Sequence, residues 1–391
     1  MLEYKKALDL ILSETSTLPA ENVELSGALH RVLTEDVVSD TDMPPFNKSA
    51  MDGYACRKSE LGNELEVVEI LYAGKKPEKQ ISVNQCYKIM TGAMVPAQAD
   101  FVFKKEDSRQ VGENRVICTR QSHTSNICFA GEDIRKGDRL LHKQTLIRPR
   151  HLPVLAGAGV FRPSVYKLPV VGVFATGTEL VEPYTVPLPH QIRNSNSSQL
   201  CGQLSEMKID PHYGGIIPDE EEILTHVLQQ AVESNDVTLL TGGVSVGDLD
   251  LVPVILERLG MDILVTSTAI KPGKPVVFAK KGCRYVFGLS GNPVSAFVQF
   301  ELYVKAFLYK LSGYDYRPGI LTLPFGSDFD REYAGRTNFV PVVINSDMEV
   351  VPVEFHGSAH ISALSHADYL MEIPAGIHSI RKGELVHVRP V

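Results

Sequence analysis

A glycine-rich loop between a strand and a helix is the feature that most restricts how this chain can fold. It runs from Thr241 to Asp250 with the sequence TGGVSVGDLD, and it follows the short apolar run 237–240, which is typical of a buried strand. Pro253 suits the first turn of the next helix, and Gly260 suits its end. Glycine permits a positive φ and a close approach to a ligand, and N–H groups near a helix N-terminus attract anions. The loop therefore predicts an anion-binding turn, unless it only connects the strand to the helix.

The composition favours a cytoplasmic protein with several domains. A chain of 391 residues exceeds one hydrophobic core, so we expect two to four domains. The net charge of -8 argues against a general nucleic-acid binder. The six cysteines are scattered without a C-x-x-C pair, which is typical of a reduced compartment. We see no N-terminal signal and no apolar run near the ~18 residues of a membrane span, so we expect no membrane contact.

Changes in periodicity along the chain predict four parts. Residues 3–13 and 148–158 both have apolar side chains at helical spacing, so these two segments are expected to pair as a stalk. Short alternating runs between them, separated by Gly, Pro, Asn and Asp, indicate a β-rich insert. The predicted parts are helical stalk segments 1–24 and 141–166, a β-rich insert 25–140, an α/β domain 167–313 and a C-terminal β-barrel-like domain 314–391.

Strands and helices alternate between residues 168 and 312, which predicts a doubly wound α/β domain with a mostly parallel sheet. Ligands of such folds bind beyond the carboxyl ends of the strands. The loops expected at that edge are those at Thr176, Thr241, Lys271 and Ser290. After the last of these loops, Asn292 is expected to be the N-cap and Pro293 to start a helix that continues over 294–311.

Four stretches together resemble the molybdopterin molybdenumtransferase family, to which the C-terminal domain of gephyrin is related. They are 45–54, 241–250, Lys271 to Pro275 (KPGKP) and 291–295 (GNPVS), and 131–133 (GED) lies between the first two. The resemblance covers essentially the whole chain in the family's order. It implies an L-shaped subunit of four parts and a homodimer, in which the cleft of the α/β domain faces the β-rich insert of the partner subunit.

The resemblance also implies an activity. The α/β domain would bind molybdopterin and its adenylate, and the enzyme would insert molybdate into adenylylated molybdopterin with release of AMP. A divalent cation, Mg²⁺, would assist. The implied protein partners are the molybdopterin adenylyltransferase and the apo-molybdoenzymes that receive the cofactor.

The oxyanion chemistry agrees with the residues that carry the resemblance. Molybdate is a tetrahedral dianion, and Lys271 and Lys274 lie on one short loop that its prolines stiffen. With the hydroxyl of Ser295 at a helix N-terminus, they can hold an oxyanion. In the family an arginine and a serine from the last domain complete this site, and they match Arg336 and Ser362. A solvated surface charge is the plain alternative for each lysine.

The resemblance further assigns the remaining site residues. The expected catalytic residues are Asp250, Lys271, Lys274 and Asp52, the last from the partner's insert. The expected substrate-binding residues are Thr176, Gly177, Gly242, Gly243, Ser245, Gly291, Asn292, Ser295, Arg336 and Ser362. The expected metal ligands are Glu179, Asp219 and Asp250, because cleavage of a phosphoanhydride needs a cation against the developing charge. Alternatively, Asp219 and Asp250 only stabilise helix N-termini, and Asp52 is only a turn residue.

The chain departs from the family's usual pattern at three places. Asn47 stands where aspartate is usual, Ser290 where proline is usual, and 128–130 reads CFA where the family tends to be rich in arginine. Two other functions are therefore weighed beside the transferase. One is a non-catalytic dimeric scaffold of the same fold, and the other is an enzyme similar to a molybdopterin adenylyltransferase. The histidines His356, His360 and His366 suggest a metal site only weakly, because His356 precedes a loop glycine.

Overall fold

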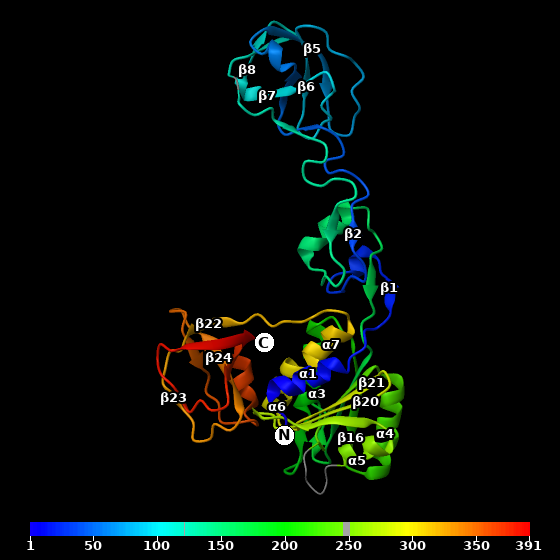
Figure 1. Cartoon of the computed structure of the whole chain (residues 1–391), viewed down its shortest axis with the longest axis vertical. Coiled ribbons are helices and arrows are strands. Elements are labelled where there is room, and N and C mark those ends of the chain that lie inside the picture. The colour runs from blue at the N-terminus through cyan, green and yellow to red at the C-terminus, as the bar shows by residue number, and fades with distance from the viewer. Residues whose placement is uncertain (121, 245–250) are drawn as a thin grey trace.

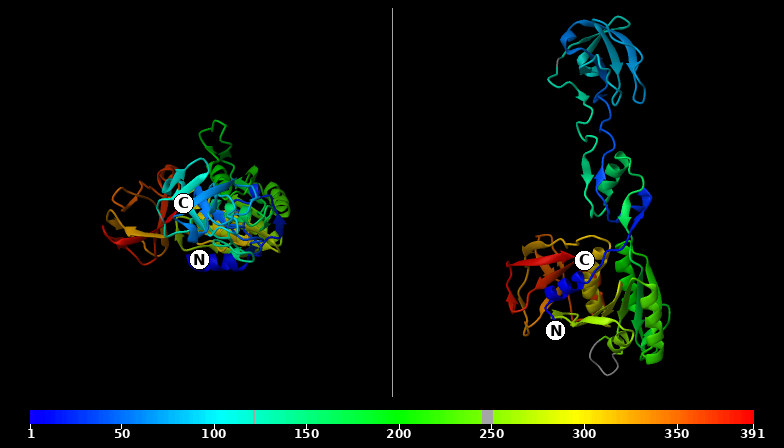
Figure 2. Two further views of the ribbon diagram at one scale, coloured as in Figure 1. Left: turned by 90° about the horizontal axis from the view of Figure 1, so that it is seen from above. Right: turned by 45° about the vertical axis from the view of Figure 1, so that its right-hand side comes forward.

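The computed structural model describes residues 1–120, 122–244 and 251–391. The molecule is elongated, with a β-rich unit at one end and two domains side by side at the other (Figure 1). A narrow stalk joins them, and the chain passes through this stalk twice (Figure 2). Among the described residues, no helix has the length and apolar character that crossing a membrane requires.

The α/β domain is built on a six-stranded, mostly parallel sheet, which confirms the predicted doubly wound arrangement. Its strands, in spatial order, are β16 (Pro211–Ile217), β13 (Val171–Thr176), β17 (Val237–Thr241), β21 (Arg284–Leu289), β20 (Pro275–Lys281) and β18 (Asp262–Ser267). All neighbours are parallel except that β20 is antiparallel to both β18 and β21. The amino end of β20 therefore lies at the same edge as the carboxyl ends of β13, β17 and β21. The four loops expected at the ligand-binding edge, those at Thr176, Thr241, Lys271 and Ser290, all start or end here.

Helices cover both faces of this sheet. One face packs against α3 (Ser195–Glu206) and a long helix, and the other packs against α4 (Glu221–Ser234) and α5 (Val252–Arg258). The long helix is α6 (Pro293–Gln299), the π-helical turn η5 (Phe300–Val304) and α7 (Lys305–Leu311) in succession. Asn292 is its N-cap as predicted, although its side chain makes no capping hydrogen bond. The continuous α-helix expected over 294–311 is interrupted, because η5 inserts a wider turn.

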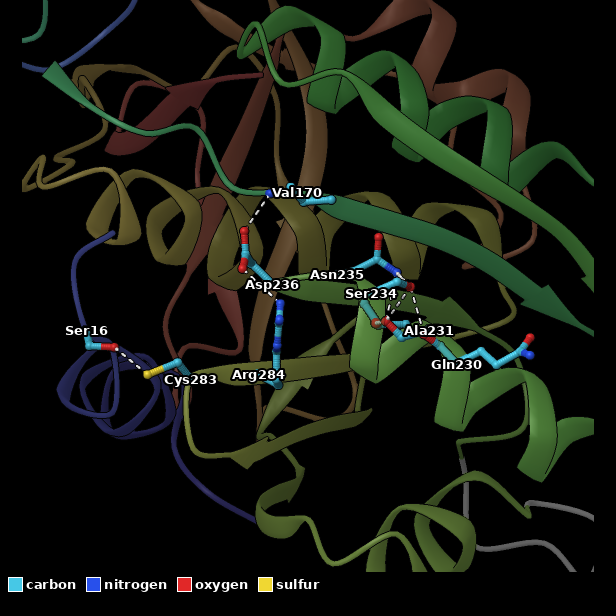
Figure 3. A network of polar contacts seen from close by, with 10 residues as sticks. Ser16, Val170, Gln230, Ala231, Ser234, Asn235, Asp236, Cys283 and Arg284 are labelled. Carbon is cyan, nitrogen blue, oxygen red and sulfur yellow. Dashed lines mark hydrogen bonds and ion pairs between the residues drawn. The ribbon is translucent and has the colours of Figure 1, made fainter. Parts of the chain in front are cut away.

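An aspartate fixes the opposite edge of the sheet, at the amino ends of the strands (Figure 3). The Asp236 carboxylate accepts hydrogen bonds from the Val170 N–H at 2.9 Å and from the Arg284 guanidinium at 3.0 Å. Val170 precedes β13, Asp236 precedes β17 and Arg284 begins β21. One carboxylate therefore aligns three parallel strands, which sets the level at which their carboxyl ends meet.

The N-terminal helix α1 (Tyr4–Ser13) corrects the expected pairing of residues 3–13 with 148–158. Its buried side chains, Tyr4, Ala7 and Ile11, belong to the core that the sheet shares with α6 and α7. The Tyr4 ring also meets Phe339 of the C-terminal domain, with ring centroids 5.2 Å apart. An i, i+3, i+7 apolar face needs an apolar partner, and the α/β core provides a larger one than the stalk.

The stalk is made of short elements instead. They are β1 (Ala20–Asn22), η1 (Leu25–Gly27), β2 (Val37–Val38), β11 (Arg139–Leu141), η4 (Pro149–His151), α2 (Leu152–Gly157) and β12 (Ser164–Tyr166). β1 pairs with β12 and β2 with β11, so the outgoing and returning chains form two antiparallel pairs. A small separate core that includes Ala28, Ile147 and Leu155 fills the stalk, and α2 packs there against η1.

The β-rich insert beyond the stalk contains a second six-stranded sheet. Its strands, in spatial order, are β7 (Phe101–Lys104), β4 (Gly53–Cys56), β6 (Gln85–Ile89), β5 (Glu64–Leu71), β9 (Arg115–Cys118) and β8 (Ser108–Val111). The pair β3 (Lys48–Ser49) and β10 (Ile127–Cys128) lies beside it, and the short turns η2 (Lys58–Glu60) and η3 (Lys105–Asp107) connect strands. The alternating runs of the sequence thus form strands as predicted.

The C-terminal domain is also β-rich, and it shares a sheet with the α/β domain. The sheet order is β19 (Ile270–Lys271), β24 (Thr337–Ile344), β26 (Tyr369–Ile373), β28 (Leu385–Pro390) and β22 (Leu321–Pro324), with β25 (Val350–Pro352) paired to β24. β23 (Phe329–Asp330) pairs with β27 (Ser379–Ile380), and η6 (Ile361–His366) is a 3₁₀ turn. β19 belongs in sequence to the α/β domain and runs parallel to β24, with Lys271 opposite Asn338. This ladder places the lysine loop directly against the last domain.

Candidate functional site

A first cleft of about 520 Å³ lies at the carboxyl edge of the α/β sheet. It is bordered by the ends of β13, β17 and β21 and by the start of α6. Eight of the predicted residues line it, namely Thr176, Gly177, Glu179, Asp219, Gly242, Gly243, Gly291 and Asn292. The prediction that separate loops converge at this edge is confirmed for the described residues. Ser245 and Asp250 fall in 245–250, outside the described residues.

Two consecutive glycines let the loop after β17 approach β13 very closely. Gly242 has φ 91° and Gly243 has φ 63°, a region that residues with a Cβ rarely adopt. A Cβ on Gly242 would lie 2.4 Å from the carbonyl oxygen of Thr176, which is backbone and cannot move aside. Glycine is therefore required here on two independent grounds, and the floor of the cleft depends on it.

Replacing Gly242 by alanine is expected to lower the stability of the α/β domain and to close the first cleft. A positive φ alone costs about 1–2 kcal/mol, and the clash with Thr176 adds to it, so the melting temperature should fall by several degrees. Gly202→Ala is the matched control, because Gly202 lies within α3 and a Cβ there would meet nothing within 4 Å. We expect that control to be neutral or slightly stabilising in calorimetry. Equal melting of the two variants would contradict the argument.

The cleft contains buried polar atoms that the described part of the chain leaves without a hydrogen-bond partner. They are Thr176 Oγ1 and Asn196 Oδ1. The other end of the Asn196 amide donates to the Gly291 carbonyl at 2.8 Å, so its free oxygen is held in a fixed direction. Buried polar atoms are almost always satisfied in folded proteins, so these atoms point to a polar ligand.

Our sequence reasoning missed Asn194 and Asn196, which also line this cleft. Asn194 is the N-cap of α3, and its Oδ1 accepts from the Ser197 N–H at 3.1 Å. The signal was present in the run RNSNSS directly before a helix. Such a run is typical of an N-terminal cap, and the cap places the next asparagine toward the strand edge.

The two described acids of the cleft hold different positions. Asp219 precedes α4, whose N-cap is Glu220, so Asp219 is not the capping residue of this helix. Its Oδ2 instead accepts from the Thr178 N–H at 3.2 Å and lies 3.4 Å from Thr178 Oγ1. The Glu179 carboxylate folds back over Gly177, where a Cβ would lie 2.6 Å from Glu179 Oε2. Both carboxylates thus belong to the loop edge of the cleft, and they can hold a hard cation.

A second cleft, of about 820 Å³, lies between the α/β and C-terminal domains. Its basic lining residues are Lys271, Lys274, Arg331 and Arg336, and Ser295 and Asn338 contribute polar atoms. Both lysine side chains are exposed into it, Ser295 is buried at the start of α6, and Asn338 Oδ1 is a buried acceptor without a partner among the described residues. A concentration of guanidinium and ammonium groups with few acids suits a small oxyanion. The predicted group Lys271, Lys274, Ser295 and Arg336 is brought together.

The two clefts share a wall. Pro275, Ser290 and Asn292 line both of them. A ligand in the first cleft can therefore place one end beside an anion in the second. This adjacency was not evident from the sequence, because it depends on how β19 and β24 pair.

The arginine of the C-terminal domain is held in place by a second arginine. Arg336 donates to the Ile270 carbonyl at 3.4 Å, and its guanidinium lies 5.8 Å from the centre of the Tyr333 ring. Arg331 donates to the carbonyl oxygens of Ile377 at 2.6 Å, Pro374 at 2.6 Å and Arg336 at 3.1 Å. Partial burial lowers the pKa of Arg331. No sequence signal identified Arg331, because its partners are distant main-chain carbonyls.

Ser362 does not have the position expected of it. It is exposed within η6, and Ser358 lines the second cleft instead. The Ser358 carbonyl accepts from the Val294 N–H at 3.1 Å, which ties this loop to the first turn of α6. The two serines stand four residues apart, and the helical turn η6 carries Ser362 away from the cleft.

Asp52 directly precedes β4 of the insert, and the insert stands apart from the α/β and C-terminal domains that form the two clefts (Figure 1). Its Oδ1 accepts from the N–H and the hydroxyl of Thr91, both at 2.7 Å, and these hydrogen bonds lower the pKa of Asp52. In the same unit Asn47 Oδ1 accepts from the Ala130 N–H at 2.8 Å. The alternative of a turn residue therefore accounts for the contacts of Asp52 within one chain.

His356, His360 and His366 are not part of a metal-binding group among the described residues. His356 and His360 stack with ring centroids 4.8 Å apart, and His356 contacts Glu354 at 2.8 Å. Within residues 1–120, 122–244 and 251–391 no group of three or more His, Cys, Asp or Glu side chains has an arrangement that suits a metal ion. The loop interpretation of these residues agrees with this geometry.

Family models match nearly the whole chain in order. Residues 2–159 match the MoeA N-terminal region (domain I and II), 172–310 match a probable molybdopterin binding domain, and 327–391 match the MoeA C-terminal region (domain IV). The two clefts lie within and between the second and third of these regions.

Relatives of known name extend over the full length. The chain is 33% identical over 397 residues to a molybdopterin molybdenumtransferase of Staphylococcus epidermidis, covering 99% of this chain and 95% of that protein. It is 31% identical over 398 residues to the protein of the same name from Staphylococcus aureus, with the same coverage. The crystal structure of a molybdopterin biosynthesis moeA protein from Pyrococcus horikoshii OT3 aligns over 100% of both chains with a TM-score of 0.86 and 30% identity. The domains match in order, and the resembling stretches 271–275 and 291–295, with the described part of 241–250, line two adjoining clefts, so the chain belongs to the molybdopterin molybdenumtransferase family.

Proposed function

We propose that this protein is a transferase of molybdenum cofactor biosynthesis, which inserts molybdate into adenylylated molybdopterin and releases AMP. The observation that carries this proposal is the common wall of the two clefts. One cleft is formed by glycine loops and a helix N-terminus, which suit phosphates, and the other contains the cations, which suit a small dianion. Insertion of molybdate requires that it lies next to the pterin, and two adjoining binding sites would hold the two substrates side by side.

The residues divide the work by their position. Gly242, Gly243 and Gly291 allow the backbone to approach the adenylyl and pterin phosphates, and Thr176 and Asn196 offer free polar atoms. Lys271, Lys274 and Arg336 bind and orient molybdate from the second cleft, with Ser358 in the place first assigned to Ser362. Molybdate is a substrate here, so the cations need to hold its charge only until the two dithiolene sulfurs bond to molybdenum, with one displaced oxygen leaving as water with the two thiol protons.

Glu179 and Asp219 fit a bound Mg²⁺, because both are oxygen ligands at the edge of one cleft. Mg²⁺ typically takes one or two carboxylates together with substrate phosphates, so a site without a complete protein cage is ordinary for it. When bound, the ion neutralises charge that develops as the bond to AMP breaks. Asp250 remains our third proposed ligand and catalytic residue.

AMP release tests the proposal directly. Purified protein is incubated with adenylylated molybdopterin, molybdate and Mg²⁺, and AMP is quantified by chromatography. We expect AMP to form only when all components are present. No AMP above the level without protein would reject the transferase in favour of the scaffold. Formation of adenylylated product from molybdopterin and ATP would favour the adenylyltransferase instead.

The two residues that favour a scaffold both make specific contacts within the fold. Asn47 and Ser290 depart from the family's usual residues, but each makes specific contacts, Asn47 with the Ala130 N–H and Ser290 with Asn292 and Gln299. Asn47 lies outside both clefts, whereas Ser290 is part of their common wall and is held there by these hydrogen bonds. Residues that serve the local fold do not indicate lost chemistry.

We also propose a homodimer in which Asp52 reaches the first cleft of the partner subunit. In one chain the insert stands apart from the two domains that form the clefts (Figure 1), and Asp52 lines neither cleft. Light scattering at micromolar concentration should give twice the monomer mass. An Asp52→Asn subunit mixed with a subunit defective at Lys274 should regain part of the activity, since one cleft of the mixed dimer is intact. A monomeric mass, or no regained activity, would contradict the shared cleft.

The remaining partners follow from the same activity. An enzyme that supplies adenylylated molybdopterin and apo-enzymes that accept the finished cofactor are the proposed protein partners, and the cytoplasm is the proposed compartment. We propose no role in binding nucleic acid or membranes.

A further inference from the structure

One buried glutamine connects the two loops that separate the clefts. Gln299 is the last residue of α6 and is fully buried. Its Nε2 donates to the carbonyl oxygens of Gly273 at 2.9 Å and Pro275 at 2.6 Å, and its Oε1 accepts from the Ser290 N–H at 2.9 Å. Both N–H bonds of the amide and one lone pair of its oxygen are therefore used.

These hydrogen bonds hold the lysine loop on both sides of Lys274. Gly273 and Pro275 are its chain neighbours, so the backbone that carries the Lys274 side chain is fixed before and after it. The loop also packs tightly on the glutamine, because a Cβ on Gly273 would lie 3.1 Å from Gln299 Cγ. Lys274 Nζ extends from an anchored main chain into the second cleft.

The third hydrogen bond reaches the common wall. Ser290 has an N–H to donate, which the proline usual at this place in the family lacks. Its hydroxyl oxygen in turn accepts from the Asn292 N–H at 3.2 Å, just before α6. The chain from the lysine loop through Gln299 to Ser290 and Asn292 therefore crosses from one cleft to the other.

We propose that Gln299 is a positioning residue for the oxyanion: it sets the place of Lys274 relative to the wall that the clefts share, and so determines how well molybdate binds. The inference rests on the proposed function for its substrate. Gln299 does not touch the cleft itself, because it lies behind the two loops. Its effect is on binding of the oxyanion, whereas binding of the pterin depends on the first cleft.

The decisive variant is Gln299→Met, which keeps the length and volume of the side chain but makes none of the three hydrogen bonds. Gln203→Met is the matched control. Gln203 is also buried, and its Nε2 donates to Glu301 at 2.9 Å, away from both clefts. We expect Gln299→Met to raise the half-saturating molybdate concentration for AMP release at least tenfold, with little change for the pterin substrate. Gln203→Met should stay within about twofold of wild type.

Amide hydrogen exchange of the peptide covering 270–276 gives a readout that does not need activity. Exchange should become faster in Gln299→Met and stay unchanged in Gln203→Met. Gln299→Glu should behave like Gln299→Met, because it keeps the acceptor for Ser290 but places a carboxylate against two carbonyl oxygens. Wild-type molybdate affinity in the glutamate variant would overturn the assignment to the lysine loop.

The two proposals fail in different ways. If the wild-type protein releases no AMP, the proposed function is rejected, and titration calorimetry with molybdate alone together with the exchange measurement still tests Gln299. If AMP is released but Gln299→Met matches Gln203→Met in both exchange and molybdate dependence, the positioning role is rejected. Thermal melting of each variant confirms that folded protein is compared.

Discussion

Replacing Lys274 by alanine is expected to raise the half-saturating molybdate concentration by roughly 10- to 150-fold while pterin binding changes little. Losing one charged hydrogen-bond donor to an anion costs about 1.5–3 kcal/mol, which corresponds to that range. Lys274 lines only the second of the two clefts, so the effect should be confined to the oxyanion. Initial rates of AMP release at varied molybdate, and separately at varied adenylylated molybdopterin, measure both dependences.

Lys281→Ala is the matched control for this experiment. Lys281 ends the strand β20 whose other end follows Lys274, and its ammonium group donates to the Leu259 carbonyl at 2.7 Å. The control loses the same charge at the opposite edge of the same sheet. A Lys274→Ala protein with the molybdate dependence of Lys281→Ala would show that the lysine is only a solvated surface charge.

The second large effect is expected for Asp219→Asn, which should lower AMP release by roughly a hundredfold at low Mg²⁺ and recover in part at high Mg²⁺. Charge neutralisation by a held cation is worth several kcal/mol of barrier, so weakening the hold slows the reaction at a given Mg²⁺ concentration. The asparagine oxygen can still accept from the Thr178 N–H, so the melting temperature should hardly change. Rates over a Mg²⁺ series and a Mg²⁺ titration by calorimetry measure the two effects.

Glu220→Gln provides the comparison for Asp219→Asn. Glu220 is the next residue, is exposed, and makes no capping hydrogen bond at α4. The Glu220→Gln substitution removes one negative charge from the same loop, but Glu220 does not line the first cleft. Loss of activity in both variants would show that the negative electrostatic potential of the whole loop matters, rather than a ligand role of Asp219. Full activity of Asp219→Asn at low Mg²⁺ would exclude Asp219 as a ligand.

The strand ends could be predicted from the sequence because the signals there are local. A β-branched run and a glycine pair predict the end of the strand at Thr241, and a proline predicts the start of the helix near 252, without any knowledge of distant contacts. The parallel arrangement then brings such turns to one edge. The first cleft was therefore accessible from the order of elements alone.

The second cleft was only partly accessible, because long-range pairing builds it. The short strand β19 pairs with β24 of another domain, and no local sequence pattern at Ile270 and Lys271 indicates this strand pairing. The lysines and Arg336 were found through the family resemblance, whereas Arg331 and Gln299 act on main-chain carbonyls that any residue could supply. Side chains that position other residues through main-chain carbonyls have no characteristic spacing in the sequence.

The prediction of where α1 packs was wrong for a related reason. Its apolar face identifies a buried helix, but an amphipathic pattern does not say against what the helix packs. Ser362 failed because two serines lie close in sequence and the turn between them is irregular.

The common core of the α/β and C-terminal domains has a consequence for unfolding thermodynamics. Phe339 and Leu370 of the last domain lie in the same apolar cluster as α1 and the central sheet, and the ladder between β19 and β24 adds main-chain hydrogen bonds. These domains should therefore unfold in one cooperative transition, while the insert, with its own core, unfolds in another. Because molybdate would bind between two parts of one cooperative unit, linkage predicts that it raises the melting temperature of that transition and leaves the insert's transition unchanged.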